Sequence, residues 1–159
     1  MPKLDHEPLC LITSGCLQKQ LSAGFLKNLG AWSYLVDHVQ EQKHSSGTSF
    51  NTSSDEMALT AVVRGLEEVE IPSNIEVTVT NEFLMNGATL WLYAWKKNNW
   101  KTFTGQEIEN KKLWQELEKR IDFHTKVTWK LASTTKLRPE INFVDKLCQL
   151  EIAAVISGL

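Results

Sequence analysis

The sequence predicts an α/β domain: a five-stranded mixed sheet, made of three antiparallel hairpin strands plus two further strands, flanked by helices on both faces. Two observations support this fold class. Short apolar or alternating segments recur five times, and segments with helical spacing separate the later ones. The order of three strands, a helix, a strand, helices, a strand and a helix then favours a sheet covered by helices. The 159 residues suffice for one domain with a substantial core.

The first three strands are predicted to form an antiparallel meander. Residues 9–13, LCLIT, form a short apolar run, and a loop is predicted over residues 15–30. Residues 30–38 alternate in polarity and are rich in residues that favour strands. A polar turn at 41–47 then leads into a short third strand at 48–52. Strands that follow one another in this way usually pair with each other.

The first helix has a defined start and end. Ser53 and Glu56 stand at the two ends of an S-x-x-E capping box, in which the serine hydroxyl accepts a hydrogen bond from the backbone three residues later. Pro72 ends the segment because proline cannot continue a helix. The apolar positions between these signals fall on one stripe, which consists of Ala58, Ala61, Val62, Leu66 and Val69.

The second half of the chain combines helices with two strands. Gly87 is predicted to end a short helix, because glycine is common just past helix C-termini. The elements expected here, in chain order, are a strand at 75–79, the short helix at 81–86, a helix to Lys97, a helix at 110–122, a strand at 126–131, a loop at 132–138 and a helix from Pro139 to about Ser157.

Composition limits the possible roles. The formal net charge of −2 excludes a molecule whose whole surface attracts nucleic acid, so such binding needs a local patch. No apolar stretch reaches the roughly 18 residues that a membrane span needs, and the first apolar run is too short for a secretion signal. The three cysteines are odd in number and lack metal-ligand spacing, which predicts reduced thiols and a cytoplasmic location. Residues 1–7 are interpreted as a polar lead-in and residues 8–159 as one domain.

The segment from Trp91 to Trp114 is the most informative part of the chain, because it holds four of the six tryptophans. Trp91 and Trp95 are four residues apart and therefore share one helix face. Three lysines interleave with Trp100 directly after them. One interpretation is a helical hairpin packed on buried tryptophans, with solvated lysines. The other is a nucleic-acid-binding protrusion, in which aromatic side chains brace a loop whose lysines contact phosphates.

This segment resembles the basic protrusion of bacterial ribonuclease HI, whose pattern is W-x-x-x-W-K-K-x-x-W-K, a variable turn, and N-x-x-L-W. The matching residues are Trp91, Trp95, Lys96, Lys97, Trp100, Lys101, Asn110, Leu113 and Trp114. The resemblance extends over nearly the whole chain from about Pro8, although only the middle is dense in identities. It implies a ribonuclease H-like fold and binding of RNA–DNA hybrid or duplex by the protrusion.

The same resemblance implies a degenerate catalytic centre. The family hydrolyses RNA in RNA–DNA hybrids with two Mg²⁺ ions, which four carboxylates hold. Asp145 matches the carboxylate of the last helix, whereas Ser14, Ala58 and Thr80 occupy the other three positions. The segment ASTTKLR before the last helix also lacks the family's histidine. We therefore expect no bound magnesium and no other cofactor, and an enzyme is not the favoured interpretation.

Three functions remain open from the sequence. The favoured one is a catalytically degenerate domain that binds nucleic acid through the protrusion. Ser53 and Asn86 align with positions that grip the hybrid backbone in the family, although helix capping explains Ser53 better and a turn explains Asn86 equally well. One alternative is a protein-interaction or connector module with a protein partner. The further alternative is weak residual hydrolysis of hybrids, which would depend on Asp145.

Overall fold

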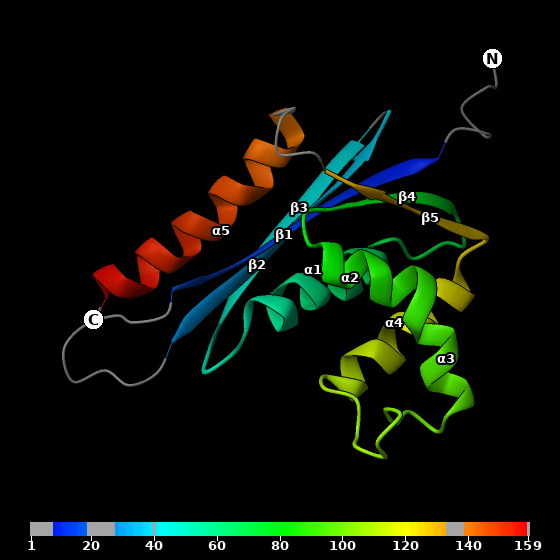
Figure 1. Ribbon diagram of the computed structural model, residues 1–159. Coiled ribbons are helices and arrows are strands. Elements are labelled where there is room, and N and C mark those ends of the chain that lie inside the picture. Colours follow the sequence, from blue (N-terminus) through cyan, green and yellow to red (C-terminus); the bar gives the residue numbers. More distant parts are fainter. Residues whose placement is uncertain (1–7, 19–27, 40, 133–138, 159) are drawn as a thin grey trace.

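The computed structural model describes residues 8–18, 28–39, 41–132 and 139–158 (Figure 1). The predicted lead-in and most of the loop predicted before the last helix lie outside the described residues. Among the described residues, no helix is long and apolar enough to cross a membrane.

The sheet has five strands in the order β3-β2-β1-β4-β5. β1 pairs antiparallel with β2 and parallel with β4, whereas β2–β3 is antiparallel and β4–β5 is parallel. This arrangement confirms the predicted mixed sheet of a three-stranded meander and two further strands. The strands are β1 (Leu9–Gln18), β2 (Leu29–His38), β3 (Glu41–Phe50), β4 (Asn74–Val79) and β5 (Lys126–Leu131).

Helices cover both faces of the sheet, as predicted. Figure 1 shows α5 along one face of the meander, with the other helices on the opposite side. The larger apolar core lies between the sheet and α1 and α4, and two smaller clusters lie beneath α5. The helices are α1 (Ser54–Glu68), α2 (Glu82–Asn86), η2 (Gly87–Trp91), α3 (Leu92–Lys97), α4 (Lys111–Phe123) and α5 (Pro139–Ser157).

The predicted turn at 41–47 is wrong, because these residues belong to β3. β3 pairs with β2 along its whole length, from His38–Glu41 to Leu29–Phe50. As an edge strand it exposes most of its side chains, so its sequence carries no alternation between buried and polar residues. The predicted loop from residue 15 also begins too early, since β1 continues to Gln18. Cross-strand pairing, rather than local side-chain pattern, fixes both boundaries.

α2 ends at Asn86 with Gly87 as its C-cap residue, as predicted. The backbone at Gly87 stays right-handed helical (φ −60°, ψ −46°), so the chain passes without a break through the π-helical turn η2 into α3. A side chain at Gly87 would overlap the ring of Trp114, which is 2% exposed. The missing side chain of Gly87 therefore leaves room for the buried indole of Trp114. This contact joins residues distant in sequence, so local sequence does not reveal it.

Candidate catalytic centre and nucleic-acid interface

The fold brings the four predicted catalytic positions toward the carboxyl ends of β1 and β4. Ser14 lies in β1, and Thr80 directly follows β4. These strands are parallel, and their pairing ends with Ile12 opposite Thr78, two residues before Ser14 in β1 and two before the exposed Thr80. Gly15 packs so tightly on α1 that a Cβ atom there would lie 2.5 Å from the backbone nitrogen of Ala58. The first helix is thereby held against the same stretch of β1.

Asp145 reaches this end of the sheet from α5. The Ser14 hydroxyl donates a hydrogen bond to its Oδ1 at 2.5 Å, and Ser14 is 4% exposed. A hydrogen bond from a hydroxyl to a carboxylate is short and strong because the acceptor is charged. The carboxylate at the position that would hold a metal ion in the family thus accepts a hydrogen bond from a side chain of β1.

The two acids at the start of α1 are engaged in local caps. Asp55 Oδ1 accepts a hydrogen bond from Asn81 Nδ2 at 2.9 Å, and Asn81 Oδ1 caps α2 at the Leu84 nitrogen. Glu56 Oε1 accepts from Thr52 Oγ1 at 2.8 Å. The bond of Asp55 ties the starts of α1 and α2 together, whereas that of Glu56 stays within the start of α1. Neither carboxylate has a hydrogen bond to Ser14 or Asp145 among the described residues.

These residues do not fit a pair of magnesium ions. Two divalent cations require several nearby carboxylates, because each ion prefers oxygen ligands and carries two charges. The four positions supply one carboxylate and two hydroxyls, and Ala58 supplies no oxygen. The part of the chain that the structure describes contains no group of three or more His, Cys, Asp or Glu side chains able to hold a metal ion. The expected absence of magnesium remains a prediction.

A pair of thiols lies beside Ser14 and Asp145. Cys148 contacts the Ser33 hydroxyl at 3.2 Å and donates to the Ser14 carbonyl at 3.5 Å. Its hydrogen bond with Cys16 lowers the pKa of Cys148, whereas the same bond and burial raise the pKa of Cys16. Cys16 therefore keeps its proton, which argues against a nucleophilic role for it. No disulfide joins the cysteines.

The protrusion consists of the end of η2, α3 and the loop that leads to α4; α3 and this loop project away from the sheet in Figure 1, whereas α2 lies at their foot against β4 and β5. Trp114 is buried at its base, and Trp95 meets it edge-on with ring centroids 5.1 Å apart. Trp91 lies 6.0 Å from Trp95 and 5.2 Å from Phe83, which is 44% exposed. The aromatic contacts thus run from the buried Trp114 through the half-buried Trp95 and Trp91 to the exposed Phe83.

Sequence reasoning missed Phe83. Phe83 and Trp91 are eight residues apart, which places them on one face of a continuous helix. The predicted break at Gly87 separated them into two helices and hid this relation. Their contact arises because the backbone stays helical from α2 through η2.

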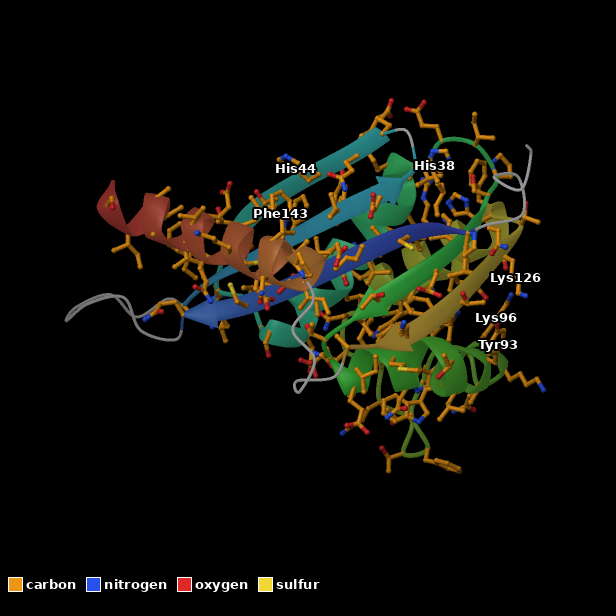
Figure 2. All side chains as sticks on the ribbon, turned by 90° about the horizontal axis from the view of Figure 1, so that it is seen from above. His38, His44, Tyr93, Lys96, Lys126 and Phe143 are labelled. Carbon is orange, nitrogen blue, oxygen red and sulfur yellow. The ribbon has the colours of Figure 1, made fainter. Side chains whose placement is uncertain are left out.

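The three lysines of the protrusion are not equivalent. Lys96 Nζ lies 2.7 Å from Glu118 Oε2 of α4, and this hydrogen bond raises the pKa of Lys96. Figure 2 shows Lys96 and Tyr93 on the side of the molecule that also carries Lys126. Lys97 and Lys101 are exposed, and no ion pair connects them to an acid within the described ranges. They are therefore the cations best placed to meet phosphates.

The two remaining predicted contacts are structurally distinct. Ser53 Oγ accepts a hydrogen bond from the Glu56 nitrogen at 3.0 Å, so the predicted capping role is confirmed. Asn86 is half-buried at the end of α2 and its side chain caps nothing. A role for either residue in gripping a nucleic-acid backbone stays a prediction.

A family model described as RNase H matches residues 11–152. The chain belongs to the ribonuclease H family. Its relatives include Ribonuclease H of Hydrogenovibrio crunogenus, which is 34% identical over 118 residues, covering 74% of this chain and 81% of the relative. Ribonuclease HI of Haemophilus ducreyi is 32% identical over 121 residues, covering 76% and 78%. These relatives confirm the predicted resemblance to the HI type.

Solved ribonuclease H structures share the fold. LC9-RNase H1, described as a type 1 RNase H with the type 2 active-site motif, superposes with a TM-score of 0.71 and 19% identity, covering 91% of this chain and 72% of that chain. The foamy viral protease-reverse transcriptase in complex with RNA/DNA hybrid gives a TM-score of 0.75 at 11% identity, covering 95% and 21%. Members of this fold thus include a protein solved with a bound hybrid.

Proposed function

We propose that this chain is a catalytically degenerate ribonuclease H domain that binds RNA–DNA hybrid or duplex through its protrusion without two-metal hydrolysis. The hydrogen bond between Ser14 and Asp145 is the observation that carries this proposal. In the family pattern several carboxylates meet at this place, and they repel one another unless metal ions neutralise them. Here a neutral hydroxyl donor and one aspartate stand in their place. Such a centre is stable without a metal and lacks the charge to hold two.

The protrusion supports the binding half of the proposal. The exposed Phe83 packs against the half-buried Trp91, and this aromatic pair lies close in the chain to Lys97 and Lys101. Contacts to phosphates supply sequence-independent affinity, and aromatic faces add apolar contact. With a net charge of −2, this local patch rather than the whole surface provides the attraction.

One assay tests both halves. A labelled RNA–DNA hybrid is incubated with the full chain in Mg²⁺ or Mn²⁺ and followed for retention and for cutting. We expect retention that weakens steeply as salt rises, without cleavage. Changing Lys97 and Lys101 together to glutamate should abolish retention. Unchanged binding by that variant would refute the role of the protrusion.

Weak residual hydrolysis is a second candidate, because relatives at 30–34% identity are named Ribonuclease H. The same assay separates it from the proposal. Cleavage by the wild-type chain that disappears in Asp145→Asn would favour the enzyme. Cleavage that survives this change would point to a contaminating nuclease instead.

A further inference from the structure

Two cysteines face each other where α5 packs on β1, beside the candidate catalytic centre. Cys148 is the buried member, with 0% of its surface exposed, and the half-buried Cys16 packs against the same small apolar cluster. The two thiols also form a hydrogen bond with each other. They come from opposite ends of the chain, so only the assembled fold brings them together.

The geometry of β1 and α5 places this pair of thiols next to Ser14 and Asp145. Cys16 follows Ser14 by two residues, and side chains two apart point to the same face of a strand. Cys148 follows Asp145 by three residues and therefore shares its side of α5. The strand and the helix thus meet in two successive contacts, one polar and one between thiols.

α5 approaches the sheet closely at Cys148. Its sulfur lies 3.5 Å from the Ser14 carbonyl oxygen and 3.2 Å from the Ser33 hydroxyl. Ser33 is the partner of Ser14 in the pairing of β1 with β2, so both contacts lie at one level of the sheet. A disulfide requires two Cα atoms within about 7 Å of each other. Because one side chain of α5 already reaches the backbone of β1, a short movement of the helix suffices for a bond to Cys16.

The third cysteine is too distant to compete. Cys10 precedes Cys16 by six residues of β1, which corresponds to about 20 Å in a strand that rises roughly 3.3 Å per residue. It packs against a different apolar cluster, which contains Ile12 and Leu35. Of the three cysteines, only Cys16 and Cys148 are therefore placed to join within one chain.

We propose that Cys16 and Cys148 are a modification site, at which a peroxide oxidant produces a reversible disulfide between α5 and β1. Hydrogen peroxide transfers one oxygen atom to the first thiol, which becomes a sulfenic acid, and its O–O bond breaks to release water. The second thiol attacks that sulfur, so the S–S bond forms, the S–O bond breaks and a second water leaves. Two thiols and one peroxide thus give one disulfide and two waters.

The disulfide would tie the strand that carries Ser14 to the helix that carries Asp145. Because it closes most of the chain into one loop, it reduces the conformational freedom of the unfolded state. We therefore expect oxidation to raise the melting temperature by at least about 5 °C. This inference goes beyond the proposed function and does not depend on nucleic-acid binding.

The test treats the reduced full chain with hydrogen peroxide at mildly alkaline pH, where more of each thiol is ionised. Free thiols are then alkylated and counted by mass spectrometry, and thermal unfolding is recorded with and without dithiothreitol. We expect two of the three thiols to disappear while Cys10 remains open to alkylation. Dithiothreitol should restore both thiols and return the melting temperature to its starting value.

Two variants locate the bond. Trypsin leaves Cys10 and Cys16 on one peptide, residues 4–19, and Cys148 on residues 147–159. Cys10→Ser is the matched control, and it should keep both the link between these peptides and the thermal shift. Cys16→Ser should lose both, and Cys16→Ala repeats the comparison if the serine variant does not fold.

A link that persists without Cys16, or one that forms only between separate chains, would overturn the inference. Loss of thiols to sulfinic acid without any link between the two peptides would do the same. The hybrid-binding assay is run under reducing conditions, so its failure would refute the proposed function and leave the disulfide standing.

Discussion

At the residue scale, the candidate catalytic centre is defined by the hydrogen bond between Ser14 and Asp145. Ser14 is buried, and its hydroxyl donates to a carboxylate at 2.5 Å. An aspartate in the same place would set two negative charges in contact. Like charges at that distance cannot both ionise without cost, so the pKa of one carboxyl rises. The hydroxyl thus stabilises a metal-free centre.

We expect Ser14→Asp to lower the free energy of unfolding by about 1–3 kcal/mol at neutral pH without divalent cations. The repulsion raises the folded-state pKa of one carboxyl, so stability returns as the pH falls through that value and the group is protonated. Urea unfolding at neutral and mildly acidic pH measures both effects. Ser14→Asn is the control, because it has the same size without the charge. Equal stability of the two variants at neutral pH would contradict the prediction.

At the scale of elements, α3 and α4 are joined by the ion pair of Lys96 and Glu118. Lys96 is therefore paired with an acid, whereas Lys97 and Lys101 form no ion pair among the described residues. The sequence pattern alone treated all three as equivalent. The difference arises from the packing of α4 against the helix that bears Lys96, which is a tertiary contact.

We expect Lys97→Gln and Lys101→Gln each to reduce the dependence of log affinity on log salt by about one, as loss of a phosphate contact implies. Lys96→Gln should reduce it less, because Glu118 already competes for its charge. Glu118→Gln should strengthen hybrid binding by releasing Lys96. Binding isotherms at several salt concentrations measure these slopes. An equal effect of all three lysine changes, together with no effect of Glu118→Gln, would refute this ranking.

The elements themselves were predictable where local signals agree with tertiary structure. β5 and α5 lie where alternation and a proline start predict them. The prediction failed at residues 41–47, where an edge strand needs no buried face. At Gly87 the end of α2 was predicted, but the π-helical turn that follows it directly was not. The pair of Phe83 and Trp91 across that turn was missed for the same reason.

At the scale of the whole molecule, the scaffold of the family persists, and we propose that its metal-binding charges are reduced. The sheet order and the helices on both faces are those of a ribonuclease H domain. Family resemblance predicts the four catalytic positions, but not the bond between Ser14 and Asp145, which are 131 residues apart. That bond depends on how α5 packs on β1, so only the assembled fold reveals it.

If the scaffold is intact, restoring the lost charges should restore a metal site. We expect the triple variant Ser14→Asp, Ala58→Glu and Thr80→Asp, with Asp145 retained, to gain thermal stability as Mg²⁺ is added, by about 2.7 kcal/mol at a concentration one hundred times the dissociation constant. The wild-type chain should show little change, because one carboxylate cannot hold two cations. Thermal unfolding at increasing Mg²⁺ measures the difference.

The matched control adds Asp145→Asn to the triple variant, and it should lose most of the magnesium response. A labelled hybrid then shows whether the restored site also cuts RNA, which depends on positioning in addition to binding. A triple variant whose stability ignores magnesium would mean that the four positions no longer converge. A strong magnesium response of the wild-type chain would mean that Asp145 recruits ligands from outside these positions, and the proposed degeneracy would then fail.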